Sequence, residues 1–295
     1  MSELLIPFGI HKVTGEIVEP EDAPKGRACN CLCPGCKAPL LSRHPKEKRY
    51  HFAHDSRHKD AKPEEECPFN SALAVAMMVR EVATQAVGKI LETPPLEVMA
   101  HYPCCGDYDF LQVSRGASNV IDSAQASTKA LGHHVDLLLE VGGYPILVDL
   151  VYKGKPPIII DENSLQEKKA ALLELDCDSF SISALKSDRN LRFSDAVLAF
   201  LLKTGERDWR FHPKTVAVLK KAKRDHRCAR PESSRYVAPR NSYRPNSPIE
   251  RKPQVIKRDP VRYQCIMCHV EWMHDFSHGL RCPKCQSHLF AREIS

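Results

Sequence analysis

The feature that most restricts the fold of this chain is the clustering of its cysteines. Of 13 cysteines, five lie between Cys29 and Cys67, and four lie between Cys265 and Cys285. Glu3 precedes the first short apolar run, no basic region precedes it, and no run of about 18 apolar residues occurs. We therefore expect a cytoplasmic protein with no membrane partner. Thiols stay reduced there, so the clusters indicate metal binding rather than disulfides.

The C-terminal cluster has the spacing of a four-cysteine zinc ribbon. Cys265 and Cys268 form one Cys-x2-Cys pair, and Cys282 and Cys285 form another after thirteen intervening residues. Each pair can place two thiolates on one tight turn, and two such turns complete a tetrahedron around Zn²⁺. Such a closed site is structural. We expect the ribbon, residues 263–295, to contact either a nucleic acid or a protein partner.

The N-terminal cluster predicts a second structural zinc site, in a β-hairpin and zinc finger at residues 1–67. Its ligands would be two thiolates and two imidazoles at the Cys-x2-Cys and His-x2-His pairs: Cys33, Cys36, His51 and His54. The fourteen residues between the pairs suit a hairpin. Three other cysteines could replace a histidine: Cys29, Cys31 and Cys67.

Residues 68–220 have the pattern of an α/β domain with a mixed sheet flanked by helices. An apolar segment at 70–91 predicts a long, mostly buried helix, which Pro94 and Pro95 would end. Alternating strand-like segments follow, including a hairpin around Gly142 and Gly143. Another helix, a strand and two further helices complete the domain.

Residues 221–262 are predicted to form a basic, disordered linker. The segment holds 13 Lys or Arg against four Asp or Glu, and six prolines. It would be either a solvated tether or an arm that binds a phosphate backbone. In the second case Tyr236 and Tyr243 could stack on bases.

The segment PFGIHKVTGEIVEPEDAPKGRACNCLCPGCKAPLLSRHPKEKRYHFAH resembles the N-terminus of CoiA-like competence proteins and their phage and bacterial relatives. The resemblance covers roughly residues 6–220. It implies a restriction-endonuclease-like domain of the PD-(D/E)xK type after the finger, with Mg²⁺ at its site. The implied partner is DNA, and the implied role is DNA processing in competence, recombination or a phage or defence context.

The same resemblance supplies candidate catalytic residues. Asp136 and Asp149, on either side of the Gly-Gly turn, would hold the metal, and Asp122 matches an earlier acid of the relatives. Where the family carries a lysine or glutamine, two residues after the second acid, this chain has Val151. Lys153 would lie on the same strand face and could serve instead.

Other positions also depart from the family pattern. Asn70, Ala74 and Met78 stand where the relatives carry glutamate, histidine and lysine, and a migrated lysine could also be Lys168 or Lys169. Two functions stay open: a Mg²⁺-dependent deoxyribonuclease, or a catalytically degenerate nuclease fold that acts as a zinc-dependent DNA- or protein-binding accessory factor.

The remaining cysteines are expected to be thiols outside metal sites. Cys104 and Cys105 are adjacent, which makes a shared tetrahedral site difficult; together with Asp107 they could reinforce a metal site, but buried thiols are expected. Cys177 and Cys228 have no cysteine at ligand spacing.

Overall fold

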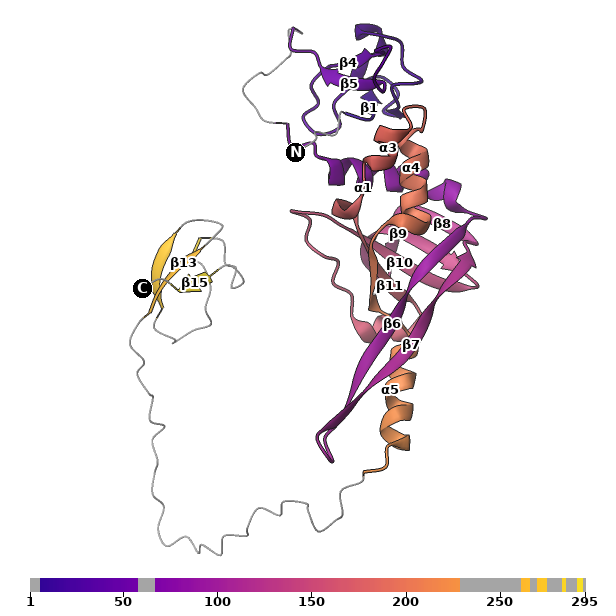
Figure 1. Ribbon diagram of the computed structural model, residues 1–295, viewed down its shortest axis with the longest axis vertical. Coiled ribbons are helices and arrows are strands. Elements are labelled where there is room, and N and C mark those ends of the chain that lie inside the picture. The colour runs from indigo at the N-terminus through magenta and orange to yellow at the C-terminus, as the bar shows by residue number, and fades with distance from the viewer. Residues whose placement is uncertain are drawn as a thin grey trace, which may run out of the picture. The chain divides into compact units, whose positions relative to one another are not determined.

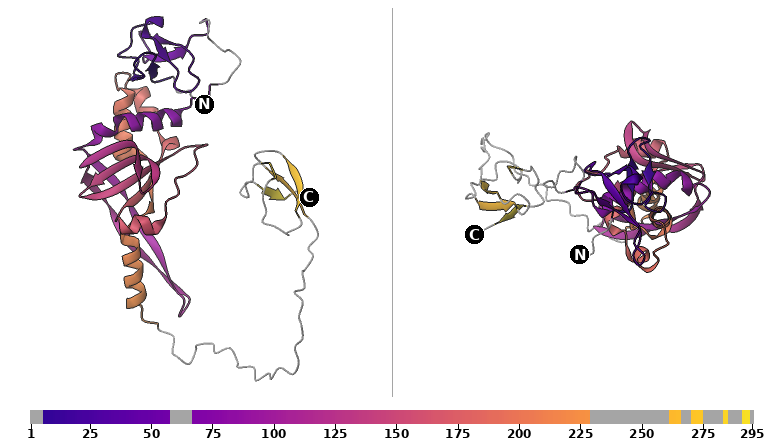
Figure 2. Two further views of the ribbon diagram at one scale, coloured as in Figure 1. Left: turned by 180° about the vertical axis from the view of Figure 1, so that it is seen from behind. Right: turned by 90° about the horizontal axis from the view of Figure 1, so that it is seen from above.

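The computed structural model describes residues 6–57 and 67–228, and four short stretches near the C-terminus: 261–265, 270–274, 283–284 and 291–293. The chain divides into two compact units, Met1–Ser233 and Ser234–Ser295. Figures 1 and 2 show both.

The first unit begins with a small module built from short strands. β1 (Gly9–His11) pairs with both β2 (Ile17–Val18) and β3 (Cys31–Leu32), and β4 (Leu40–Arg43) pairs with β5 (His51–His54). A 3-10 turn, Arg27–Cys29, precedes β3. The module's small core includes Phe52, which is buried, together with Leu40 and several cysteines. Such a small core is typical of modules that a metal ion stabilises.

Helix α1 (Ser71–Val82) follows the module and is shorter than the helix predicted to reach residue 91. It passes into a 3-10 turn (Ala83–Ala86), and the backbone then turns at Gly88, where φ is +77°. The two prolines predicted to end the helix instead lie inside β6 (Ile90–Tyr102). Among the described strands, β6 pairs with β7 (Asp107–Val120) alone, so a proline can occupy its unpaired edge.

A five-stranded sheet forms the centre of the unit, with the order β12-β11-β10-β9-β8. Strands β8, β9 and β10 form an antiparallel meander, β11 runs parallel to β10, and β12 is antiparallel to β11. Their bounds are Ser123–Ala130, His133–Val141, Tyr144–Val151, Ala171–Asp176 and Arg207–Phe211, from β8 to β12. The mixed α/β architecture agrees with the sequence prediction.

Helices cover both faces of this sheet. α1 and α4 (Phe193–Ala199) pack on one face, where the main core includes the fully buried side chains of Val79, Leu139 and Leu150. α2 (Glu162–Glu167), on the crossover between β10 and β11, packs on the other face. The short α3 (Ser183–Ser187) and a π-helical turn (Phe200–Thr204) flank α4. A 3-10 turn, Cys177–Ser179, follows β11.

The β6–β7 hairpin extends beyond the sheet, and helix α5 (Lys214–Asp225) lies beside it (Figures 1 and 2). Leu219 and Ala222 of the helix pack against buried Ala100 and Tyr102 of the hairpin. The predicted linker begins at residue 221, whereas the helix continues to Asp225. Residues 229–260, most of that linker, lie outside the described residues.

The second unit contains a three-stranded antiparallel sheet with the order β14-β13-β15. Its strands are β13 (Val261–Cys265), β14 (Glu271–His274) and β15 (Ala291–Glu293). Of the four predicted ribbon ligands, Cys265 ends β13, and Cys268, Cys282 and Cys285 lie outside the described residues.

Candidate functional site

Three cysteines and one histidine converge in the N-terminal module. The ligand atoms of Cys33, Cys36, His54 and Cys67 all lie within 4.8 Å of one another. Cys33 and Cys36 share a turn in which Lys37 N donates to Cys33 O at 3.0 Å. His54 lies at the end of β5, and Cys67 precedes α1. The group joins three separate segments of the chain.

The separations of these atoms fit a tetrahedral zinc ion. With Zn–S of about 2.3 Å and Zn–N of about 2.05 Å, the S–S edge of a regular tetrahedron is roughly 3.8 Å and the S–N edge roughly 3.6 Å. The Sγ atoms of Cys33 and Cys67 are 3.5 Å apart, and Cys36 Sγ lies 3.4 Å from His54 Nε2. Burial raises the pKa of the Cys33 thiol to about 12, so metal binding there must displace a proton.

The group contains Cys67 in the place predicted for His51. Residues 51 and 54 belong to one strand, and side chains three positions apart on a strand point to opposite faces. His54 therefore faces the cysteines, whereas His51 Nδ1 lies 3.0 Å from the carbonyl oxygen of Arg49. The two other candidates are core thiols: Cys29 Sγ donates to Leu40 O, and Cys31 Sγ donates to Cys29 O.

A second cluster lies in the central sheet, where two acids are bridged by a lysine. Asp136 is on β9 and Asp149 is on β10, and Lys155 Nζ donates to carboxylate oxygens of both. Arg80 of α1 and Arg210 of β12 also contact these acids. We call these five residues the acid–cation cluster.

Asp136 accepts hydrogen bonds at both carboxylate oxygens. Oδ1 accepts from Arg80 Nε at 3.2 Å and from Arg80 Nη2 at 2.6 Å. Oδ2 accepts from Leu150 N at 2.9 Å and from Lys155 Nζ at 2.8 Å. Burial alone would raise the pKa of Asp136, but the hydrogen bonds from Lys155, Arg80 and Leu150 outweigh it and lower this pKa below its ordinary value.

Asp149 is fully buried and is also paired at both oxygens. Oδ1 accepts from Lys155, and Oδ2 accepts from Ile158 N at 2.9 Å and from Arg210 Nη1 at 3.3 Å. Arg210 also contacts Glu174, the neighbour of Asp149 on the parallel strand, at 3.2 Å. Burial works to lower the pKa of Lys155, but its bonds to the two acids raise that pKa overall.

Protein donors occupy both acids of this cluster in the structure. Mg²⁺ is held through carboxylate oxygens, and here both oxygens of each acid already pair with protein donors. A Mg²⁺ ion bound by both acids would have to displace Lys155, which lies between them. The cluster is therefore an ion-pair network.

Two other predicted catalytic residues, Asp122 and Lys153, form their hydrogen bonds away from the acid pair. Asp122 accepts hydrogen bonds from Gly142 N at 2.6 Å and from Gly143 N, at the turn between β9 and β10. The side chain of Lys153 is exposed, and its backbone nitrogen donates to Asp178. Strand alternation did not predict its direction because β10 ends at Val151.

Sequence reasoning missed Lys155, although it belongs to the Lys-Gly-Lys-Pro-Pro segment after β10. Its backbone nitrogen donates to Tyr152 O at 3.0 Å, which marks a turn. From this turn the Lys155 side chain reaches back to Asp136 on β9 and Asp149 on β10. Lysines in a turn directly after the second acidic strand are thus a usable signal.

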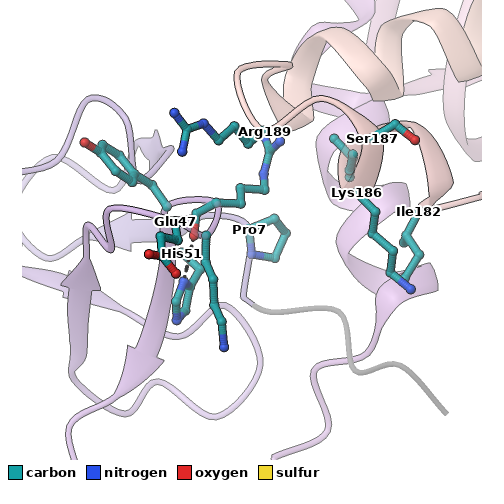
Figure 3. A pocket seen from close by; sticks show the side chains of 11 residues that line it. Pro7, Glu47, His51, Ile182, Lys186, Ser187 and Arg189 are labelled. Atoms are coloured by element: carbon teal, nitrogen blue, oxygen red, sulfur yellow. Dashed lines mark hydrogen bonds between the residues drawn. The ribbon is translucent and has the colours of Figure 1, made fainter.

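A basic pocket lies between the finger module and α3 (Figure 3). The cavity, about 430 Å³, is lined by Pro7, Glu47 and His51 of the module and by Ile182 and Lys186 from the α3 region. Its remaining lining residues include three more cations: Lys48, Arg49 and Arg189. With four cations and one acid, the pocket suits an anion.

A second Cys/His group occurs in the described part of the chain. The ligand atoms of Cys104, Cys105, His226 and Cys228 lie within 4.8 Å of one another. Two groups of three cysteines and one histidine could therefore hold zinc. Sequence spacing did not reveal the second because its two halves lie more than a hundred residues apart.

Comparisons of the chain with known proteins found no relative. No family model, curated protein or solved structure matches the chain. Among the residues that the structure describes, no helix combines the length and apolar character needed to span a membrane.

Proposed function

We propose that the protein is a zinc-dependent, nucleic-acid-binding accessory factor built on a nuclease-like scaffold that no longer hydrolyses phosphodiesters. The observation that carries this proposal is the closed acid–cation cluster, in which Lys155 bridges Asp136 and Asp149. DNA processing is the biological setting that the resemblance to CoiA-like proteins suggests.

The nuclease-like origin is supported by where the two acids lie. They occupy neighbouring antiparallel strands, β9 and β10, and a helical crossover then leads to the parallel strand β11. A scaffold of the PD-(D/E)xK type presents its acids in the same way, on a hairpin. The finger, with its Cys-x2-Cys and His-Phe-Ala-His segments, supports the same relationship.

The loss of hydrolysis is supported by the residues that stand where CoiA-like relatives carry polar site residues. Hydrolysis of this type needs carboxylates that bind Mg²⁺ and a lysine or substitute that assists the attacking water. Asn70 caps α1, because its Oδ1 accepts from Leu73 N at 2.9 Å. Ala74 and Met78 are buried in the main core, so neither supplies a polar group.

Nucleic-acid binding is supported by two concentrations of positive charge. One is the basic pocket, whose four cations come from the finger and from the α3 region. The other is the segment 221–262, with a net charge of +9. Lys and Arg side chains bind a phosphate backbone by releasing condensed counterions, which makes affinity strongly salt-dependent.

Cleavage and binding, measured together, test this proposal. The full chain is incubated with linear, circular and single-stranded DNA and with RNA, in Mg²⁺ or Mn²⁺, beside an Asp149→Asn variant. We expect no cleavage above the variant, and binding that weakens as salt is raised. Binding that is absent at low salt would overturn the nucleic-acid proposal and would favour a protein partner for the zinc modules.

A metal-dependent nuclease is the second candidate, and one contact favours it. The Lys155 ammonium is 2.8 Å from Asp136 and also bonds to Asp149, so a lysine does lie beside both acids. In that case Mg²⁺ would displace the ammonium from the acids. Cleavage that needs a divalent ion and is lost in Asp149→Asn would establish this candidate instead.

A further inference from the structure

The turn of the β6–β7 hairpin presents two adjacent cysteines. Residues 103–106 form this turn, with Gly106 at φ +80° and its N–H donating to Tyr102 O at 2.8 Å. Cys105 is buried and Cys104 is exposed, yet their Sγ atoms are only 3.8 Å apart. The turn thus directs both thiols to one place.

The end of helix α5 brings a histidine and a third cysteine to the same place. His226 follows the last helical residue, and its N–H donates to Ala222 O at 2.9 Å. The imidazole stacks on Tyr102 at a ring separation of 3.7 Å, which aims Nε2 at Cys105 Sγ, 3.3 Å away. Tyr102 is itself fixed, since its hydroxyl donates to Asp109 at 2.9 Å.

These separations fit the edges of a zinc tetrahedron. The 3.8 Å between the thiols of Cys104 and Cys105 equals the S–S edge of roughly 3.8 Å, and the 3.3 Å between Cys105 and His226 is close to the S–N edge of roughly 3.6 Å. Adjacency in sequence therefore does not prevent both thiols from binding one ion. Three sulfurs and one nitrogen form a donor set that suits zinc.

We propose that Cys104, Cys105, His226 and Cys228 bind a structural zinc ion that fastens the end of α5 to the tip of the β6–β7 hairpin. The contact closes a loop of more than a hundred residues, and it fixes the point from which the basic segment continues. His226 and Cys228 belong to the basic segment 221–262, but zinc binding by this group uses none of the Lys or Arg side chains on which the proposed function rests.

Zinc content of the full chain, purified with a reductant, tests the site. Wild type is compared with the double variant Cys104→Ser/Cys228→Ser, in which both substituted side chains are exposed. A second variant, His226→Phe, keeps an aromatic ring on Tyr102 but removes the nitrogen ligand. We expect each to bind about one zinc ion less per chain than wild type, as loss of a ligand from a closed four-ligand site predicts.

The matched control is Cys177→Ser, which removes a buried thiol that belongs to neither Cys/His group. Its zinc content should equal that of wild type, and circular dichroism should show that all variants remain folded.

Alkylation of the unmodified chain provides a measurement that needs no variant. The exposed thiols of Cys104 and Cys228 should react slowly with N-ethylmaleimide and rapidly once a chelator is added. Equal zinc content in wild type and both variants would overturn the proposal. Fast alkylation without chelator, or a disulfide joining Cys228 to the turn, would also overturn it.

Discussion

Lys155 Nζ lies 2.8 Å from Oδ2 of Asp136, although the two residues are 19 positions apart in the chain. The same ammonium bonds to Asp149, so one cation neutralises acids from two neighbouring strands. Asp149 is fully buried, and a buried charged group is costly unless it is paired and hydrogen-bonded. Lys155 thus holds two neighbouring strands of the sheet together through their acids.

Replacing Lys155 with methionine should destabilise the protein strongly. The change leaves a buried pair of acids short of a cation, and breaking a buried ion pair typically costs about 3–5 kcal/mol in the free energy of unfolding. Urea unfolding followed by circular dichroism measures this quantity. Lys153→Met is the matched control, because the Lys153 side chain is exposed, and its effect should stay within about 0.5 kcal/mol. Equal free energies of unfolding for the two variants would show that Lys155 does not stabilise the buried acids.

The acid side of the stability curve should depend on Asp136. Its pKa is lowered in the folded protein, so the unfolded chain takes up the proton first as pH falls. The contribution of Asp136 is therefore complete above its ordinary pKa of 3.8 and is lost as pH falls through the lower folded value. Unfolding free energies between pH 6 and the acid transition measure it, and the difference between wild type and Asp136→Asn should shrink towards low pH.

The pKa of Glu174 is shifted in the opposite direction, so its effect on stability has the opposite dependence on pH. Burial raises its pKa, so its contribution to stability falls as pH rises from its ordinary value to the folded one. Glu174→Gln should therefore gain stability relative to wild type over that window. A gain of the same size at every pH, including below the ordinary pKa of glutamate, would point to improved packing instead of titration.

The sequence predicted the structure correctly where the interactions that decide it join residues close together in the chain. Strand alternation and the Gly-Gly turn correctly placed Asp136 and Asp149 on paired strands. The same reasoning placed Lys153 on the strand face, because it could not locate the end of β10 at Val151. Lys155 approaches the acids through a turn, and the direction of a turn depends on tertiary packing.

The two Cys/His groups show the same limit. Cys33, Cys36 and His54 were found by spacing, whereas Cys67 was only one of several candidates, because nothing local specifies which distant thiol completes a tetrahedron. His51 was preferred over it on spacing, yet strand geometry turns His51 away. The Cys105–His226 contact arises from the packing of α5 on a hairpin, which local sequence cannot reveal.

The first zinc group should lose its ion when Cys67 is replaced and keep it when His51 is replaced. Cys67→Ser removes one of four converging ligand atoms, and His51→Gln removes a side chain that faces away from them. Zinc content and the visible absorption of the cobalt-substituted protein distinguish these outcomes. Loss of zinc in His51→Gln, with the zinc content of Cys67→Ser unchanged, would instead support the predicted site with two histidine ligands.

The basic pocket should contribute directly to nucleic-acid affinity. Lys186 lines the pocket from α3 and is exposed, so Lys186→Glu reverses a charge with little effect on packing. If Lys186 contacts a phosphate, the variant should bind less tightly to all sequences, and the slope of log K against log salt should fall by about 1. Fluorescence anisotropy with a labelled duplex from about 50 to 200 mM salt measures both quantities. Lys129→Glu, an exposed substitution on β8 with the same charge change, is the control, because Lys129 does not line this pocket. An equal decrease in both variants would mean that net charge alone governs binding, and the pocket would then have no specific part in it.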